Sequence, residues 1–207
     1  MEKFSTLTAI AAPLLRNNVN TDMMTPSETG RSTAVDLGKM LFLHWRYDES
    51  GKEKPDFVLN RAPFRNAGIL IAGENFGCGS SRERAVWALQ RFGIRAVIAP
   101  SFSDIFRENA FQNGLLPVVL PAHEVATLAA AMETAADPRL TVDLVRSLVV
   151  THDGRELPFT VPAERRDALL EGLEEIDVIL RMKDDTAAFE VRDRAARPWI
   201  YLERQPT

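Results

Sequence analysis

A glycine-rich segment early in the chain combines residue types that bind an anion. Gly77 and Gly79 are followed by Ser80, Ser81 and Arg82. Glycine lets the backbone adopt positive φ and pass close to a ligand. The free N–H groups at a helix start and a planar guanidinium both favour a carboxylate or a phosphate. The segment therefore predicts an anion-binding turn with two candidate proton-transfer hydroxyls.

The glycine spacing excludes two nucleotide-binding motifs. No Lys-Ser/Thr pair follows the glycines, as a Walker A loop requires, and Arg82 occupies the place of the third glycine in Gly-x-Gly-x-x-Gly. A purely structural strand-to-helix turn is the alternative. Cys78, in the same turn, could be a nucleophile, but no histidine lies nearby in sequence to serve as its base. We interpret it as a packing residue.

A polar, Asn-rich segment at residues 18–26 is the second candidate site. Its composition is typical of a loop with turn chemistry. Asp22 could be a charged partner of a catalytic group, with the hydroxyls of Thr21 and Thr25 donating to a substrate. The alternative is an Asx turn that closes a loop.

Composition narrows the class of protein. The 207 residues carry a formal charge of -4, which argues against nucleic acid as a partner because phosphate binding needs a basic patch. No apolar run approaches the roughly 20 residues of a membrane helix, and the N-terminus lacks a signal-peptide pattern. We therefore expect a cytoplasmic protein without membrane contact. No linker divides the chain, which predicts one domain over residues 1–207, with a C-terminal helix and tail from about residue 184.

The sequence offers no ligand set for a metal. One cysteine allows no internal disulfide and cannot hold an iron–sulfur cluster, which generally takes three or four cysteines. The three histidines, His44, His123 and His152, lack metal-ligand spacing. We expect no metal bound by this chain, so any metal used in its function comes from another chain.

The middle of the chain alternates between buried strands and helices. The strands are expected at 67–72, 94–99 and 115–120, and the helices at 82–92 and 103–112. This β-α-β-α-β order with short connections predicts a parallel sheet with right-handed crossovers.

The flanking regions predict further elements. A strand at 6–12 and a helical stretch at 37–45 precede the middle. Strands at 141–151 and 156–161 are expected to form a hairpin around Asp153-Gly154. Helical and strand patterns elsewhere predict these elements: helices at 122–136, 162–172 and 184–195, and a strand at 176–180.

Three segments together resemble the small subunits of the 3-isopropylmalate dehydratase family, in the aconitase superfamily. They are 73–83, 18–26 and 98–106, and the resemblance runs from about residue 4 to residue 195. It implies an α/β fold: a layered β/β/α swivel domain with a parallel central sheet and a smaller antiparallel part.

The family's activity is divided between two chains. The resemblance implies a hydro-lyase that isomerises 2-isopropylmalate and 3-isopropylmalate by dehydration and rehydration in leucine biosynthesis. The large subunit carries a 4Fe-4S cluster, and the small subunit is a mobile domain that closes over it. The expected assembly is a heterodimer or heterotetramer, active only with the large subunit and acting on a hydroxy-dicarboxylate.

The resemblance assigns roles to the turn residues. Ser80 would be the general base that removes the proton α to a carboxylate, its alkoxide stabilised by helix-start N–H groups and Arg82. Ser81 and Arg82 would bind substrate carboxylate. Asp22 would reach a catalytic histidine of the large subunit.

Two other positions in the second segment follow from the resemblance. Thr21 and Thr25 would lie beside Asp22, near the active site. Asn20 stands where the family has aspartate, which removes one charge from the loop.

The sequence departs from the family after Pro26. Residues 27–32 replace a stretch containing lysine and an aromatic residue, and Arg84 and Val86 replace His and Pro. In the family this loop faces the variable side group of the substrate, so Arg31 is a candidate contact for an extra carboxylate, or a solvated loop charge. The alternatives are therefore another substituted malate, such as dimethylmalate or citramalate, and a non-catalytic binding module.

Overall fold

A computed structural model describes residues 1–26, 36–79 and 82–201 of the chain. The chain divides into two compact units, Met1–Gly172 and Leu173–Thr207. Two compact units can belong to one domain, so this division does not test the predicted single domain over residues 1–207, which stays a prediction. Each unit is described by itself.

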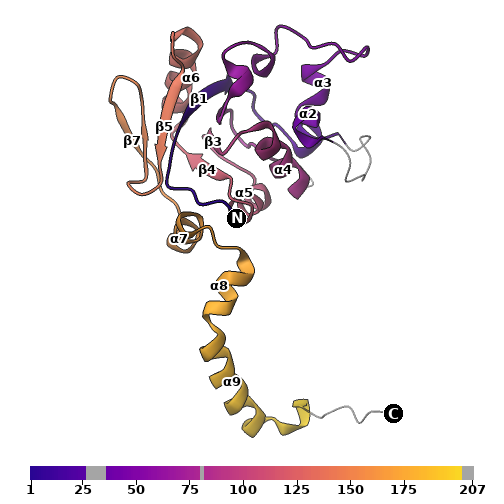
Figure 1. The fold of residues 1–207 in the computed structure, drawn as a ribbon, viewed down its shortest axis with the longest axis vertical. Coiled ribbons are helices and arrows are strands. Elements are labelled where there is room, and N and C mark those ends of the chain that lie inside the picture. Colours follow the sequence, from indigo (N-terminus) through magenta and orange to yellow (C-terminus); the bar gives the residue numbers. More distant parts are fainter. Residues whose placement is uncertain (27–35, 80–81, 202–207) are drawn as a thin grey trace. The chain divides into compact units, whose positions relative to one another are not determined.

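A sheet organises the first unit (Figure 1). Within the described residues its strands run in the order β4-β3-β2-β1-β5-β6-β7. The strands are β1 (Thr6–Leu14), β2 (Ile69–Ala72), β3 (Ala96–Ala99), β4 (Leu116–Val119), β5 (Arg139–Asp143), β6 (Leu148–Val150) and β7 (Glu156–Pro158). Strands β1 to β4 pair in parallel, and β5 to β7 add an antiparallel edge beside β1. This arrangement confirms the predicted fold class.

The parallel strands are apolar at almost every position because both faces of the sheet are covered. In β2, Leu70 packs in one buried cluster, whereas its neighbours Ile69 and Ile71 pack in the other. Helix α4 (Glu83–Phe92) contributes to the first cluster and α6 (Ala122–Thr134) to the second. Helix α5 (Asp104–Gln112) contributes to both. The predicted alternation of strands and helices is therefore correct.

The region between β1 and β2 contains, in its described part, short helices. They are α1 (Thr21–Met24), α2 (Leu37–Met40), α3 (Leu43–Arg46), and the 3-10 turns η2 (Val58–Asn60) and η3 (Phe64–Asn66). The single helical stretch expected at 37–45 is wrong: Phe42 has a left-handed backbone, with φ 52°, and separates α2 from α3.

Two predictions near the C-terminus are also wrong. In place of the single strand expected at 141–151 there are two strands, β5 and β6, which pair with each other across a turn where Ser147 has φ 56°. The expected hairpin around Asp153-Gly154 is correct, because β6 pairs antiparallel with β7. The expected strand at 176–180 is part of helix α8 (Glu175–Arg181). A capping box between Glu174 and Asp177 starts this helix, so local capping outweighs the β-branched residues that suggested a strand.

The last helix of the first unit is α7 (Ala163–Glu171), and the second unit holds α8, α9 (Lys183–Ala196) and η4 (Pro198–Tyr201). The Tyr201 hydroxyl donates to Asp193 at 2.7 Å, which joins η4 to α9. Neither α8 nor α9, both fully described, has a buried residue. Within the described ranges, no helix is long and apolar enough to cross a membrane.

Candidate active site

Three loops meet at one edge of the parallel sheet. Strands β1, β2 and β3 are neighbours and run in the same direction, so the segments that follow them leave the sheet at the same edge. These segments contain the three stretches that the sequence singled out, 18–26, 73–83 and 98–106. The topology therefore brings them together.

The first two loops are joined mainly through their backbones. Three backbone hydrogen bonds connect them: Asn18 N to Glu74 O at 2.9 Å, Gly77 N to Val19 O at 2.8 Å, and Thr21 N to Cys78 O at 3.1 Å. A side-chain bond also joins the loops, from Asn75 Nδ2 to Asn18 Oδ1 at 2.8 Å. The half-buried Cys78 thus joins the two loops through its backbone carbonyl, and its interpretation as a packing residue stays a prediction.

The third loop supports the glycine-rich turn from the other side. Phe76 N donates to Ser101 O at 3.1 Å, and Asn75 N donates to the Ser101 hydroxyl at 2.8 Å. Sequence reasoning gave Ser101 no role of its own. Its position directly after a parallel strand next to β2 is the signal that identifies it.

Gly77 is required by both its backbone and its neighbour. Its φ is +78°, and a Cβ at this position would lie 2.1 Å from Phe106 Cγ. Phe106 in turn packs edge-on against Phe76, with ring centroids 5.4 Å apart. The aromatic cluster beneath the turn therefore accepts only glycine at residue 77.

Asp22 and Arg82 form an ion pair between the two predicted segments. Arg82 Nη2 lies 3.0 Å from Asp22 Oδ1, and the side chains are 39% and 53% exposed. Asp22 is in the first turn of α1, which Asn20 caps by accepting from Met23 N at 2.8 Å. Asn20 thus supplies the cap that an aspartate would supply, without its charge.

The two threonines of this segment are buried. The Thr25 hydroxyl donates to Thr21 O at 3.2 Å, so it has a partner within the same turn. Thr21 is 0% exposed, and its Oγ1 has no hydrogen-bond partner within the described part of the chain. A Cβ on Gly79 would lie 3.8 Å from that oxygen, which places the Thr21 hydroxyl directly beside the glycine-rich turn.

The remaining predicted residues, Ser80, Ser81 and Arg31, lie outside the described residues. Among the residues that are described, no group of three or more His, Cys, Asp or Glu side chains could hold a metal ion.

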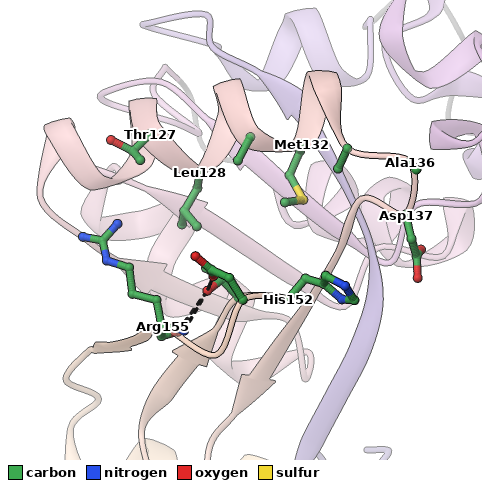
Figure 2. Close-up of a pocket in the computed structure, with 11 residues that line it drawn as sticks. Thr127, Leu128, Met132, Ala136, Asp137, His152 and Arg155 are labelled. Atoms are coloured by element: carbon green, nitrogen blue, oxygen red, sulfur yellow. Dashed lines mark hydrogen bonds between the residues drawn. The ribbon is translucent and has the colours of Figure 1, made fainter.

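A separate cavity of about 420 Å³ lies between α6 and the β6–β7 hairpin (Figure 2). Leu128 and Met132 point into it from α6, and His152 and Arg155 approach from the hairpin. None of the predicted site residues lines it. The candidate active site is therefore the loop cluster and not this cavity.

Comparison with known proteins identifies the family. Residues 1–123 match the family model described as the aconitase C-terminal domain. The 3-isopropylmalate dehydratase small subunit of Rhodospirillum centenum is 50% identical, over 96% of this chain and 98% of its own. The corresponding small subunit of Paramagnetospirillum magneticum is 48% identical, over 97% of this chain and 100% of its own. The chain belongs to the 3-isopropylmalate dehydratase small-subunit family.

A solved structure agrees with this membership. The crystal structure of 3-isopropylmalate dehydratase from Methanocaldococcus jannaschii superimposes with a TM-score of 0.60 at 25% identity, covering 88% of this chain and 98% of that one. The resemblance noticed in the three loop segments is thereby confirmed. The family match at residues 1–123 contains all three loops of the candidate site, whereas the antiparallel edge and the C-terminal helices lie beyond it.

Proposed function

We propose that this chain is the small subunit of a two-chain hydro-lyase that interconverts 2-isopropylmalate and 3-isopropylmalate in leucine biosynthesis. The observation that carries the proposal is the meeting of Asp22 and Arg82 beside the glycine-rich turn. This chain is also 48–50% identical to two 3-isopropylmalate dehydratase small subunits over nearly their whole length. The names of these relatives support isopropylmalate over dimethylmalate or citramalate as the substrate.

In the proposed reaction, Ser80 takes the proton from the carbon α to a carboxylate. The neighbouring carbon loses its hydroxyl, a double bond forms, and water then adds back with the hydroxyl on the other carbon. A serine hydroxyl is a weak acid, so its alkoxide needs the N–H groups at the start of α4 and the charge of Arg82.

Substrate binding is assigned to the same turn. Ser81 and the fork of Arg82 hold a carboxylate, and Thr21 and Thr25 lie beside it. Asp22 orients a histidine of the large subunit. Arg31 would contact an extra carboxylate on another substituted malate; isopropylmalate offers none, so with this substrate Arg31 is a solvated loop charge.

The partner is a large subunit that carries a 4Fe-4S cluster. The single cysteine of this chain does not fit the three-thiolate ligand set of such a cluster, so those ligands belong to the partner. When bound to the partner, the cluster would supply the Lewis acid that polarises the departing hydroxyl. We propose a cytoplasmic heterodimer or heterotetramer in which neither chain is active alone.

Reconstitution with the cluster-bearing large subunit tests the proposal. We expect no activity from this chain alone and turnover of isopropylmalate by the pair, followed by the absorbance of the alkene intermediate. Ser80→Ala should lower kcat by about 10³-fold, the scale of general base catalysis, whereas Ser5→Ala at an exposed position should not.

Three outcomes would contradict the proposal. They are full activity of the isolated chain, a Ser80→Ala variant within a few-fold of wild type, and turnover of another substituted malate in preference to isopropylmalate. A Cys78→Ala variant with full turnover would dismiss a thiol nucleophile.

A further inference from the structure

Helix α5 and the residues at its two ends contact the glycine-rich turn on both sides of residues 80–81. At the N-terminal end, Ser103 N donates to Phe76 O at 3.0 Å, and Phe106 lies against Gly77. At the C-terminal end, Asn113 Nδ2 donates to Glu83 Oε1 at 2.9 Å. A single helix thus supports the turn before and after its proposed catalytic centre.

Both ends of the Asn113 side-chain amide have hydrogen-bond partners of the right kind: a donor for its oxygen and acceptors for its nitrogen. The indole N–H of Trp87 can only donate, and it lies 2.8 Å from Asn113 Oδ1. The Glu83 carboxylate and the carbonyl of Asn109 can only accept, and each lies 2.9 Å from Nδ2. These partners fix the orientation of the amide and use both of its hydrogens. Aspartate, of the same shape, would lose both donations.

Glu83 is the first residue of α4 and directly follows Arg82. A movement of Glu83 would therefore move the N–H groups at the start of α4 and the backbone of the adjacent Arg82. A second bond, from Gln90 Nε2 to Asn113 O, joins the same asparagine to a later turn of α4. Asn113 consequently holds α4 at two levels.

We propose that Asn113 is a positioning residue for the reaction: through Glu83 it holds the start of α4, and with it Arg82, in register with Asp22. This inference rests on the proposed function for its kinetic consequences. The arrangement of α4 itself can be measured without any activity.

The competing role is structural, in which Asn113 merely stabilises the packing of α4 on α5. A smaller folded fraction lowers Vmax and leaves KM unchanged. A shift of Arg82 away from the substrate carboxylate raises KM as well. The KM is therefore the quantity that separates the two roles.

The test compares Asn113→Asp with the double exchange Asn113→Asp/Glu83→Gln. In the single variant two carboxylates face each other. In the double variant the introduced glutamine can donate to the introduced aspartate, so the lost hydrogen bond returns with donor and acceptor exchanged. The bond to Asn109 O is missing from both variants, so any recovery reports on the Glu83 contact alone. Asn66→Asp, at an exposed position, is the matched control.

Two measurements are made on the full-length chain. In the reconstituted pair, we expect Asn113→Asp to raise the KM for isopropylmalate about tenfold, as for partial loss of a charge-assisted hydrogen bond, and to lower kcat. In the double variant, the KM should return to within about threefold of the wild-type value. In the free subunit, hydrogen exchange of the backbone amides at 84–86 should be faster in Asn113→Asp than in wild type. In the double variant it should return to the wild-type rate.

Unchanged exchange at 84–86 in Asn113→Asp would overturn the inference. An unchanged KM in Asn113→Asp, when the wild-type pair is active, would also overturn it. The same holds if the double variant shows no recovery relative to the single variant. If the wild-type pair has no activity on isopropylmalate, the proposed function is refuted instead. The hydrogen-exchange measurement on the free subunit would still test whether Asn113 positions the start of α4.

Discussion

The guanidinium of Arg82 lies 3.0 Å from the carboxylate of Asp22, and this ion pair links the turn after β2 to the short helix after β1. The proposed reaction gives each group a different partner, a substrate carboxylate for Arg82 and a large-subunit histidine for Asp22. An ion pair this exposed contributes at most about 1 kcal/mol, so exchanging partners on assembly costs little. The pair therefore keeps both side chains at the site without locking them together.

Arg82→Lys tests this view. Lysine keeps the charge but loses the planar fork, so kcat/KM of the reconstituted pair should fall by about 10²-fold while the free energy of unfolding changes by less than about 1 kcal/mol. Arg61→Lys is the matched control, because Arg61 also forms an exposed ion pair, with Glu133 at 3.4 Å. Equal activity losses in the two variants would contradict a specific role for Arg82.

Gly77→Ala should be strongly destabilising. The added Cβ would lie 2.1 Å from Phe106 Cγ, and the backbone has φ +78°. Left-handed backbone strain and overpacking together predict a loss of roughly 2–5 kcal/mol in the free energy of unfolding, measured with urea.

Gly154→Ala is the control for backbone strain. Gly154 has φ +83°, but no atom lies within 4 Å of its Cβ position. This variant should lose only about 1–2 kcal/mol. If both variants lose the same amount, contact with Phe106 does not determine the residue at position 77.

Sequence patterns predicted the central sheet because its signals are strong and local. Buried strands such as Ile69–Ala72 are apolar throughout, and a glycine or proline closes each of the neighbouring elements. The three loop segments were grouped by the family resemblance and not by these patterns. The structure brings them together because the ends of neighbouring parallel strands lie at one edge of the sheet.

Other features depend on contacts that no local pattern contains. The left-handed backbone of Phe42 is accompanied by stacking of its ring on Trp45, with centroids 5.3 Å apart. The match between Asn113 and Glu83 requires knowing that the end of α5 lies beside the start of α4. The helix at 176–180 was missed because its apolar residues suggested a strand while Glu174 and Asp177 supplied a capping box.

Acid should weaken the fold partly through Glu53. Two hydrogen bonds from Arg65, at 2.9 and 2.7 Å, lower the pKa of the Glu53 carboxyl. Because this pKa is lower in the folded than in the unfolded chain, its stabilising contribution is present at neutral pH. That contribution is lost as the pH falls below about 4.

Glu53→Gln should therefore flatten the dependence of the unfolding free energy on pH in this acidic range. The measurement is a series of urea titrations between neutral and acidic pH, with Glu49→Gln as an exposed control from the same loop. A pH dependence unchanged by Glu53→Gln would show that the Arg65 contact has no thermodynamic weight.

Asn60→Leu should destabilise the first unit because it removes one hydrogen-bond acceptor from a buried cation. Arg46 is 6% exposed, and burial lowers the pKa of its guanidinium, which nonetheless stays charged. Its Nε donates to Asn60 Oδ1 at 3.2 Å, and Asn60 Nδ2 returns a bond to Arg46 O at 2.7 Å. The buried cation loses one acceptor, and the carbonyls of Arg46 and Lys54 lose their Asn60 donor, which predicts a loss of about 2–4 kcal/mol in the free energy of unfolding. Asn66→Leu, at an exposed position, should change it by less than about 0.5 kcal/mol, and equal losses in the two variants would exclude the Arg46 contact as the cause.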